Sequence, residues 1–120
     1  MRPSEQLGRY GEDLAAGHLA AAGMRVLARN WRCPRGELDV VALDVDGTVV
    51  FVEVKTRSSV RFGEPAEAVT PVKARRIRGL ALSWLADHPQ PGRRGVRFDV
   101  VTIVRAPGEP PVVRHLREAF

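Results

Sequence analysis

Three ionisable side chains lie inside segments that otherwise resemble apolar β-strands, and this pattern limits what the chain can fold into. The run VVFVEVKTR at residues 49–57 is rich in Val and contains Glu53 and Lys55. The run GELDVVAL at residues 36–43 contains Asp39. Charged side chains are rarely buried unless they are paired or bound to metal, because removing a charge from water is costly. We therefore expect these three residues to have a role other than packing.

The chain has 120 residues, which suits one compact domain over residues 1–120. It has no stretch of about 18 apolar residues, and its start lacks the basic and then apolar pattern of a secretory signal. Cys33 is the single cysteine, so neither an internal disulfide nor a two-cysteine zinc knuckle is expected. These features predict a cytoplasmic protein without a membrane partner.

The formal net charge is +5, and a basic chain is suited to polyanionic partners such as nucleic acids. Arg supplies most of this charge, because Lys occurs at positions 55 and 73 alone. A GC-rich genome also favours Arg over Lys, so the Arg excess has little weight by itself. The use of Lys at position 55, in a chain that otherwise uses Arg, favours a specific need for a compact ammonium group there.

The hydrophobic periodicity predicts an α/β fold with the order helix, three strands, helix, and one or two strands. Helices are expected at about 4–22 and 70–88, the second with Thr70 as its cap and Pro71 in its first turn. A basic loop is expected at 31–36. Three consecutive strands suit an antiparallel meander, and the strand after the second helix suits a right-handed parallel crossover. We therefore expect a mixed β-sheet flanked by helices, with strands at about 24–30, 37–43, 48–56, 96–104 and 112–116.

The pairing register of the two acid-bearing strands decides whether Asp39 and Glu53 lie together. A two-residue turn at 46–47 would place them on opposite faces of the sheet. A three-residue loop at 45–47, with Gly47 in the left-handed conformation, would place Asp39 directly opposite Glu53. We predict the second geometry.

Asp39, Glu53 and Lys55 are the side-chain types that metal-dependent hydrolysis of a phosphodiester requires. Mg²⁺ held by one or two carboxylates, or Mn²⁺ in its place, activates water and neutralises charge on the phosphate. Lys55 lies on the same strand face as Glu53 and can orient the attacking water or stabilise the transition state. Glu12, at the shoulder of the apolar face of the first helix, could hold a second ion or an outer-shell water. Flanking phosphates would be bound by Arg57, Arg61, Lys73 and Arg76.

Other interpretations of these residues remain open. A bare Glu-x-Lys motif is weak, since charged residues make up about a quarter of ordinary sequence. Glu53, Lys55 and Glu37 could instead form cross-strand ion pairs on a solvent-exposed strand face. Glu12 is nearly as well explained by a solvated helix edge, and the basic cluster of the second helix by a solvated helix face. Because they are scattered in the sequence, no chemistry is assigned to His18, His88 and His115.

Several motifs in combination make the chain resemble the YraN-like family of small bacterial proteins. They are GRYGE at 8–12, GELD at 36–39, VEVKTR at 52–57, FGEP at 62–65, AV at 68–69 before a Lys-bearing helix, and RFDVV at 97–101. The resemblance covers about residues 5–105. This family is similar to the archaeal Holliday-junction resolvases within the restriction-endonuclease-like, PD-(D/E)xK nuclease superfamily, although Leu38 stands where the superfamily name has Pro. The resemblance implies an αβββαβ core with Asp39, Glu53 and Lys55 as the catalytic triad and Glu12 as an accessory acid.

Three hypotheses for function follow. The first is a Mg²⁺-dependent DNA endonuclease that acts on branched or otherwise structured DNA. A resolvase of this kind would need a two-fold dimer to cut symmetrically related strands, so a homodimer is a possible assembly. The second hypothesis, from another class, is a nucleic-acid-binding module that keeps the fold without turnover. The third is a nuclease for RNA or single-stranded ends.

Overall fold

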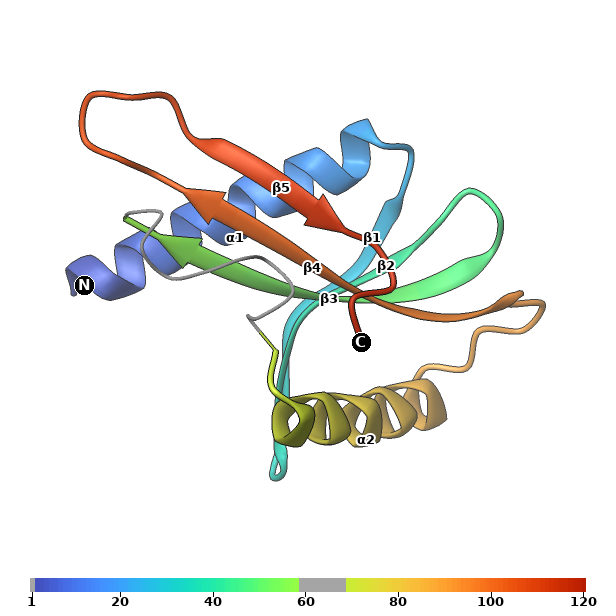
Figure 1. Cartoon of the computed structure of the whole chain (residues 1–120). Coiled ribbons are helices and arrows are strands. Elements are labelled where there is room, and N and C mark those ends of the chain that lie inside the picture. The colour runs from blue at the N-terminus through green and yellow to red at the C-terminus, as the bar shows by residue number, and fades with distance from the viewer. Residues whose placement is uncertain (1, 59–68) are drawn as a thin grey trace.

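The computed structural model describes residues 2–58 and 69–120, and within these ranges it has two helices and one five-stranded sheet (Figure 1). Helix α1 spans Pro3–Ala21 and helix α2 spans Pro71–Asp87. Neither of these helices combines the length and the hydrophobicity that crossing a bilayer requires. The strands are β1 (Arg25–Cys33), β2 (Gly36–Leu43), β3 (Thr48–Arg57), β4 (Gly95–Val104) and β5 (Val112–Leu116).

The sheet is mixed, and its strand order follows the order in the chain. Strands β1, β2 and β3 form an antiparallel meander, and β4 pairs antiparallel with β5. Strands β3 and β4 run parallel, and the chain crosses between them through α2. The predicted α/β fold, the meander and the parallel crossover are all confirmed.

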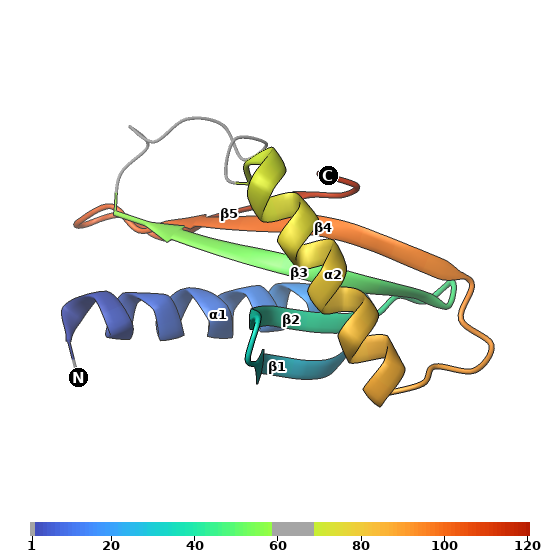
Figure 2. The same cartoon turned by 90° about the horizontal axis from the view of Figure 1, so that it is seen from below.

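The two helices cover opposite faces of the sheet, so the molecule has two hydrophobic cores (Figures 1 and 2). On one face, Leu19 of α1 belongs to the same buried cluster as Val52 of β3. On the other face, Trp84 of α2 packs edge-on against Phe51 of β3, with 5.9 Å between ring centroids. Adjacent residues of a strand point to opposite faces, so Phe51 and Val52 belong to different cores. The odd-numbered positions that follow Phe51 in β3 therefore face α2.

The β1–β2 hairpin is longer than expected, and the loop predicted at 31–36 is wrong over its first half. Trp31 pairs with Leu38 and Cys33 pairs with Gly36, which leaves a two-residue turn at 34–35. Pairing with β2 satisfies the backbone groups of this basic segment, and composition alone does not reveal that pairing. The predicted start of the first helix differs only slightly, since α1 begins at Pro3.

The hairpin between β2 and β3 has the predicted three-residue loop at 45–47. The N–H of Asp44 donates to the carbonyl of Thr48 at 2.8 Å, which closes the loop. Gly47 ends the loop with a φ of 90°, a left-handed conformation that glycine adopts without a steric penalty. This loop length sets the register of the two acid-bearing strands.

A buried polar network holds the α1 side of the sheet together. The carboxylate of Asp99 is fully buried and accepts two hydrogen bonds from Arg97, at 2.9 and 3.0 Å, and one from Nε2 of His115 at 2.7 Å. Arg97 also donates to Asp44 at 3.0 Å, and Nδ1 of His115 lies 3.1 Å from Nε2 of His18 in α1. Burial by itself would raise the pKa of Asp99, but the hydrogen bonds from His115 and Arg97 hold that pKa below its usual value. Four segments of the chain are therefore joined through one satisfied carboxylate.

A close approach of α1 to β3 depends on Gly11. A Cβ atom at this position would overlap Oγ1 of Thr56 in β3, whereas a Cβ atom at Gly17, further along the same helix, would meet nothing within 4 Å. The two glycines share one helix and differ in what surrounds them.

We predict opposite effects of alanine at these two positions. Gly11→Ala should destabilise the fold by about 1–3 kcal/mol, because the helix must move away from a β-branched side chain. Gly17→Ala should stabilise it by up to about 1 kcal/mol, because alanine loses less backbone entropy in a helix. Urea denaturation followed by circular dichroism measures both changes, and equal shifts for the two variants would contradict the packing described here.

Candidate active site

Strands β2 and β3 bring Asp39 and Glu53 together on the face that α2 covers. The regular pairing of these strands ends with Val40 opposite Val52, and one further step places Asp39 opposite Glu53. The Oδ2 atom of Asp39 accepts the N–H of Val54 at 2.9 Å, so the side chain provides β3 with a hydrogen-bond partner where the ladder ends. The predicted register therefore holds.

The two carboxylates line an open cleft of about 410 Å³ between β2, β3 and the first turns of α2. Charged side chains of both signs meet in this space. They are Glu37, Asp39, Glu53, Lys55, Lys73 and Arg76.

Glu53 is the most buried of the six charged residues that line the cleft. Its side chain is only 10% exposed, and Nζ of Lys73 lies 3.2 Å from its Oε1 atom. Burial and the nearby charge of Asp39 raise the pKa of Glu53 to about 7, against the opposing effect of Lys73. Burial also raises the pKa of Asp39, in part offset by the N–H of Val54. The pKa values of both carboxyl groups therefore stay raised, although Lys73, and for Glu53 also Lys55, favours the charged form.

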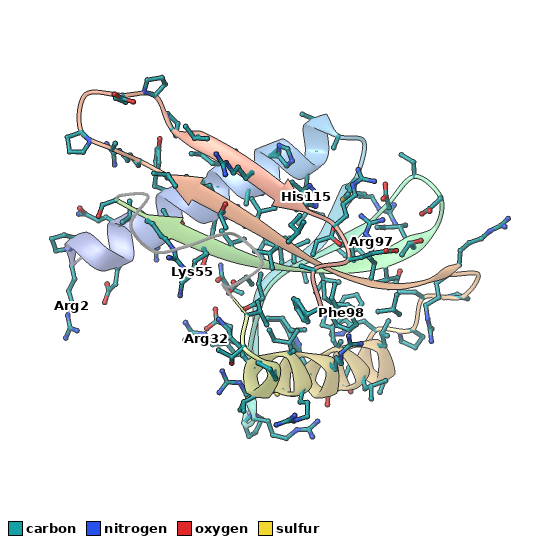
Figure 3. All side chains as sticks on the ribbon, in the orientation of Figure 1. Arg2, Arg32, Lys55, Arg97, Phe98 and His115 are labelled. Atoms are coloured by element: carbon teal, nitrogen blue, oxygen red, sulfur yellow. The ribbon has the colours of Figure 1, made fainter. Side chains whose placement is uncertain are left out.

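Lys55 extends from β3 into the same cleft and is exposed. Figure 3 shows it toward the end of β3, in a different part of the sheet from Arg97 and His115. Among the described residues, the ion pair to Glu53 comes from Lys73 and not from Lys55. The ammonium of Lys55 is therefore accessible to a molecule that binds in the cleft.

Glu12 lies close to the acid pair without joining it. Its Oε2 atom accepts a hydrogen bond from Asn30 of β1 at 3.0 Å, and the side chain lines a neighbouring cleft that also contains Lys55. The charge of Glu12 is close enough to contribute to the raised pKa of Asp39. Over residues 2–58 and 69–120, no three His, Cys, Asp or Glu side chains form a group that could hold a metal ion. The protein ligands available together are therefore Asp39 and Glu53.

The basic residues expected to bind phosphates have different positions. Lys73 and Arg76 both line the cleft from α2. Arg57, the last residue of β3, lines an adjoining cleft beside Lys55. Arg61 lies outside the described residues, so its expected role has no structural counterpart here.

Two arrangements in the structure were missed by reasoning from the sequence. The sequence does not indicate that the ammonium of Lys73 contacts Glu53. It also does not indicate that His18 and His115, far apart in the chain, touch each other next to Asp99. The available signal was Asp99, an acid within the Val-rich run RFDVV, which meets the same criterion that singled out Asp39 and Glu53.

The chain is similar to other proteins over nearly its whole length. The model of the family described as "Uncharacterised protein family UPF0102" matches residues 11–103, a range that includes Glu12 and all six charged residues of the cleft. A UPF0102 protein of Frankia alni is 56% identical over 120 residues, which cover 100% of this chain and 98% of the relative. A UPF0102 protein of Nocardia farcinica is 53% identical over 116 residues, or 97% of this chain and 90% of the relative. The chain belongs to the UPF0102 family, as its resemblance to YraN-like proteins predicted.

Proposed function

We propose that this protein is a metal-dependent nuclease that hydrolyses phosphodiester bonds in nucleic acid. The main support is the pair formed by Asp39 and Glu53, which lies at an open cleft with an incompletely compensated charge. Lys55, two residues along the same strand, lines the same cleft. Two carboxylates and an accessible ammonium are the groups that such hydrolysis uses.

The donor set fits Mg²⁺, with Mn²⁺ as a substitute. Mg²⁺ prefers oxygen ligands and keeps several water molecules, so one or two protein carboxylates are sufficient to hold it. Asp39 and Glu53 would be those ligands, because a divalent cation would offset the burial and the repulsion by neighbouring carboxylates that raise their pKa values. When bound, the ion would acidify a water ligand and neutralise charge on the phosphate. Glu12 would act from a greater distance, through a second ion or an outer-shell water.

The chain's own side chains would bind and orient the substrate. Lys55 can hold a non-bridging phosphate oxygen or orient the water for in-line attack, without a covalent intermediate. Arg57, Lys73 and Arg76 would bind flanking phosphates, so affinity should fall steeply with salt. The net charge of +5 is consistent with a polyanionic partner.

Branched DNA is the substrate class that we propose. The reason is the resemblance of the motifs GELD at 36–39 and VEVKTR at 52–57 to those of the YraN-like family, which is similar to the archaeal Holliday-junction resolvases. Symmetrical cleavage of a four-way junction would require two copies related by a two-fold axis, so a homodimer acting in the cytoplasm is part of this proposal. The competing function is a nucleic-acid-binding module that has the same fold and no turnover. The following assay separates the two functions.

We predict that cleavage requires both a divalent metal and Asp39. End-labelled four-way junction, linear duplex and single-stranded DNA are incubated with Mg²⁺, Mn²⁺ or EDTA, and products are resolved on denaturing gels. Asp39→Asn keeps the shape of the side chain and should lower the rate about 100-fold or more, because the metal loses an anionic ligand. Asp13→Asn is the matched control, because Asp13 is an exposed acid of α1 paired with Arg29.

The pattern of products also ranks the substrates. Preference for the junction supports a resolvase, and preference for single-stranded DNA supports the third hypothesis. Cleavage that persists in EDTA or in Asp39→Asn would contradict the proposed mechanism. DNA binding without cleavage in any metal, by the wild type and Asp39→Asn alike, would favour the noncatalytic module.

Ionisation of the acid pair should also lower the free energy of unfolding. The pKa of Glu53 is about 7 in the folded protein, above its usual value of 4.5, so the folded state binds the proton more tightly than the unfolded state. The stability that this difference provides is complete below the unfolded pKa and is lost as the pH rises through about 7. Glu53→Gln should therefore raise the free energy of unfolding by about 3 kcal/mol at alkaline pH and change it little in acid.

The matched variant is Asp99→Asn, which alters another buried acid. The carboxylate of Asp99 is paired with Arg97 and His115, and its pKa is lowered, so its loss should destabilise the fold by about 3 kcal/mol near neutral pH. Urea denaturation of both variants across pH gives the comparison. Destabilisation by Glu53→Gln at alkaline pH would show that Glu53 is a structural ion-pair partner.

A further inference from the structure

We propose that Lys73 is an internal counter-ion of the acid pair, which a divalent metal ion displaces and which then binds a phosphate of the substrate. This inference rests on the proposed function and assigns a regulatory step to the same cleft. Lys73 is a positioning residue in this account, because it acts through Glu53 before it meets the substrate.

The first support is the geometry of the ion pair. Nζ of Lys73 lies 3.2 Å from Oε1 of Glu53, whose side chain is 10% exposed, while the Lys73 side chain is 32% exposed. The lysine reaches from α2 into the cleft and meets the carboxylate at its inner wall (Figure 2 shows α2 crossing this face of the sheet). Asp39 lines the same cleft, and among the described residues Lys73 is the ammonium that the structure places in an ion pair with Glu53.

The second support is the position of Lys73 in its helix. The side chain of Thr70 caps α2 by accepting the N–H of Lys73 at 3.2 Å, which places Lys73 in the first turn. That turn contains no acidic residue. A cation is unfavourable at a helix N-terminus, where the helix dipole presents partial positive charge. Among residues 2–58 and 69–120, the ion pair that this ammonium makes is the one with Glu53.

These two facts predict an exchange. A divalent ion and an ammonium group compete for the same carboxylate oxygens, and the ion has the greater charge and several ligand positions. Once Glu53 binds the ion, Lys73 loses its counter-charge and is repelled by both the ion and the helix N-terminus. Its flexible, partly exposed stem allows the ammonium to move to the next anion in the cleft, which would be a phosphate.

The exchange would couple metal binding to substrate binding. Without metal, Lys73 is occupied and adds little to the attraction of DNA. With metal, the same ammonium becomes a phosphate ligand, so metal and DNA should each raise the affinity for the other. A static salt bridge would give no such coupling, because its contribution would not depend on the metal.

The first measurement is the affinity for Mn²⁺ in the absence of DNA, monitored through the EPR signal of the free ion. The wild type, Lys73→Met and Arg75→Met are compared at about pH 8.5, which lies above the pKa of about 7 of Glu53. Arg75 is the matched control, because it is exposed and lies two residues along α2, on a different face of the helix from Lys73. Lys73→Met should bind Mn²⁺ about tenfold more tightly than the wild type, and Arg75→Met should stay within about twofold.

The second measurement is the affinity for a labelled four-way junction by fluorescence anisotropy, in EDTA and in Ca²⁺, which takes the same oxygen ligands. Lys73→Met should match the wild type in EDTA and bind about fivefold more weakly in Ca²⁺. Its salt slope should fall by about one in Ca²⁺ alone. The affinity of Arg75→Met relative to the wild type should be the same in EDTA and in Ca²⁺. Circular dichroism checks that each variant is folded.

Three results would overturn the proposal. Unchanged or weaker Mn²⁺ binding by Lys73→Met would show that the ammonium does not compete with the ion. An equal loss of DNA affinity in EDTA and Ca²⁺ would make Lys73 a permanent phosphate contact. Absence of the metal site has a different signature, because the wild type would then bind Mn²⁺ no more tightly than Asp39→Asn, and this result would remove both proposals. Failure of the nuclease function alone would appear in the cleavage assay and would leave the Mn²⁺ and DNA affinities as predicted here.

Discussion

The three-residue loop between β2 and β3 is the constraint on which the rest of the cleft depends. Gly47 can adopt the left-handed φ that ends this loop, and the loop length sets the pairing of the two strands. Side chains alternate between faces, so a shift of one residue would move Asp39 to the opposite face from Glu53. The same shift would turn Val41 away from α2 and its hydrophobic core. The packing of α2 and the placement of the acid pair therefore depend on the same register.

The sheet contains two groups of buried acids with opposite electrostatics. Asp99 is held by Arg97 and His115, and its pKa is lowered because these hydrogen bonds outweigh burial. The pKa values of Asp39 and Glu53 are raised, because burial and the charges of neighbouring carboxylates outweigh the opposing effects of nearby lysines and of a backbone N–H. Burial of an acid in a Val-rich strand is common to both groups. The distinguishing feature is whether the protein itself supplies enough positive charge.

The two groups lie on different faces of the sheet. The network around Asp99 lies on the α1 side, and it joins α1, β4, β5 and the loop after β2. The cleft lies on the α2 side, where β3 ends and α2 begins. This division separates the interactions that stabilise the fold from the site that we propose for metal and nucleic acid. A change in the charge of the cleft can then occur without disturbing the network on the other face.

Features that depend on residues close together in the chain could be predicted from the amino-acid sequence. Alternation in 49–57 indicated a strand, Thr70 with Pro71 indicated a helix start, and the segment 45–47 indicated a loop length. From these local features the order of elements, the mixed sheet and the common face of Asp39 and Glu53 all followed, since strand register is set by the hairpin loop.

Tertiary structure alone decided which side chains from distant segments meet. Lys73 lies 20 positions beyond Glu53 in the chain, and the crossover through α2 brings the two within 3.2 Å. His18 and His115 are 97 positions apart, and they touch because α1 packs over β4 and β5. The position of Glu12, near Asp39 and bonded to Asn30, also depends on how α1 lies across the sheet. Packing of helices on a sheet is decided by complementary surfaces of the whole fold, and no local pattern in the sequence encodes those contacts.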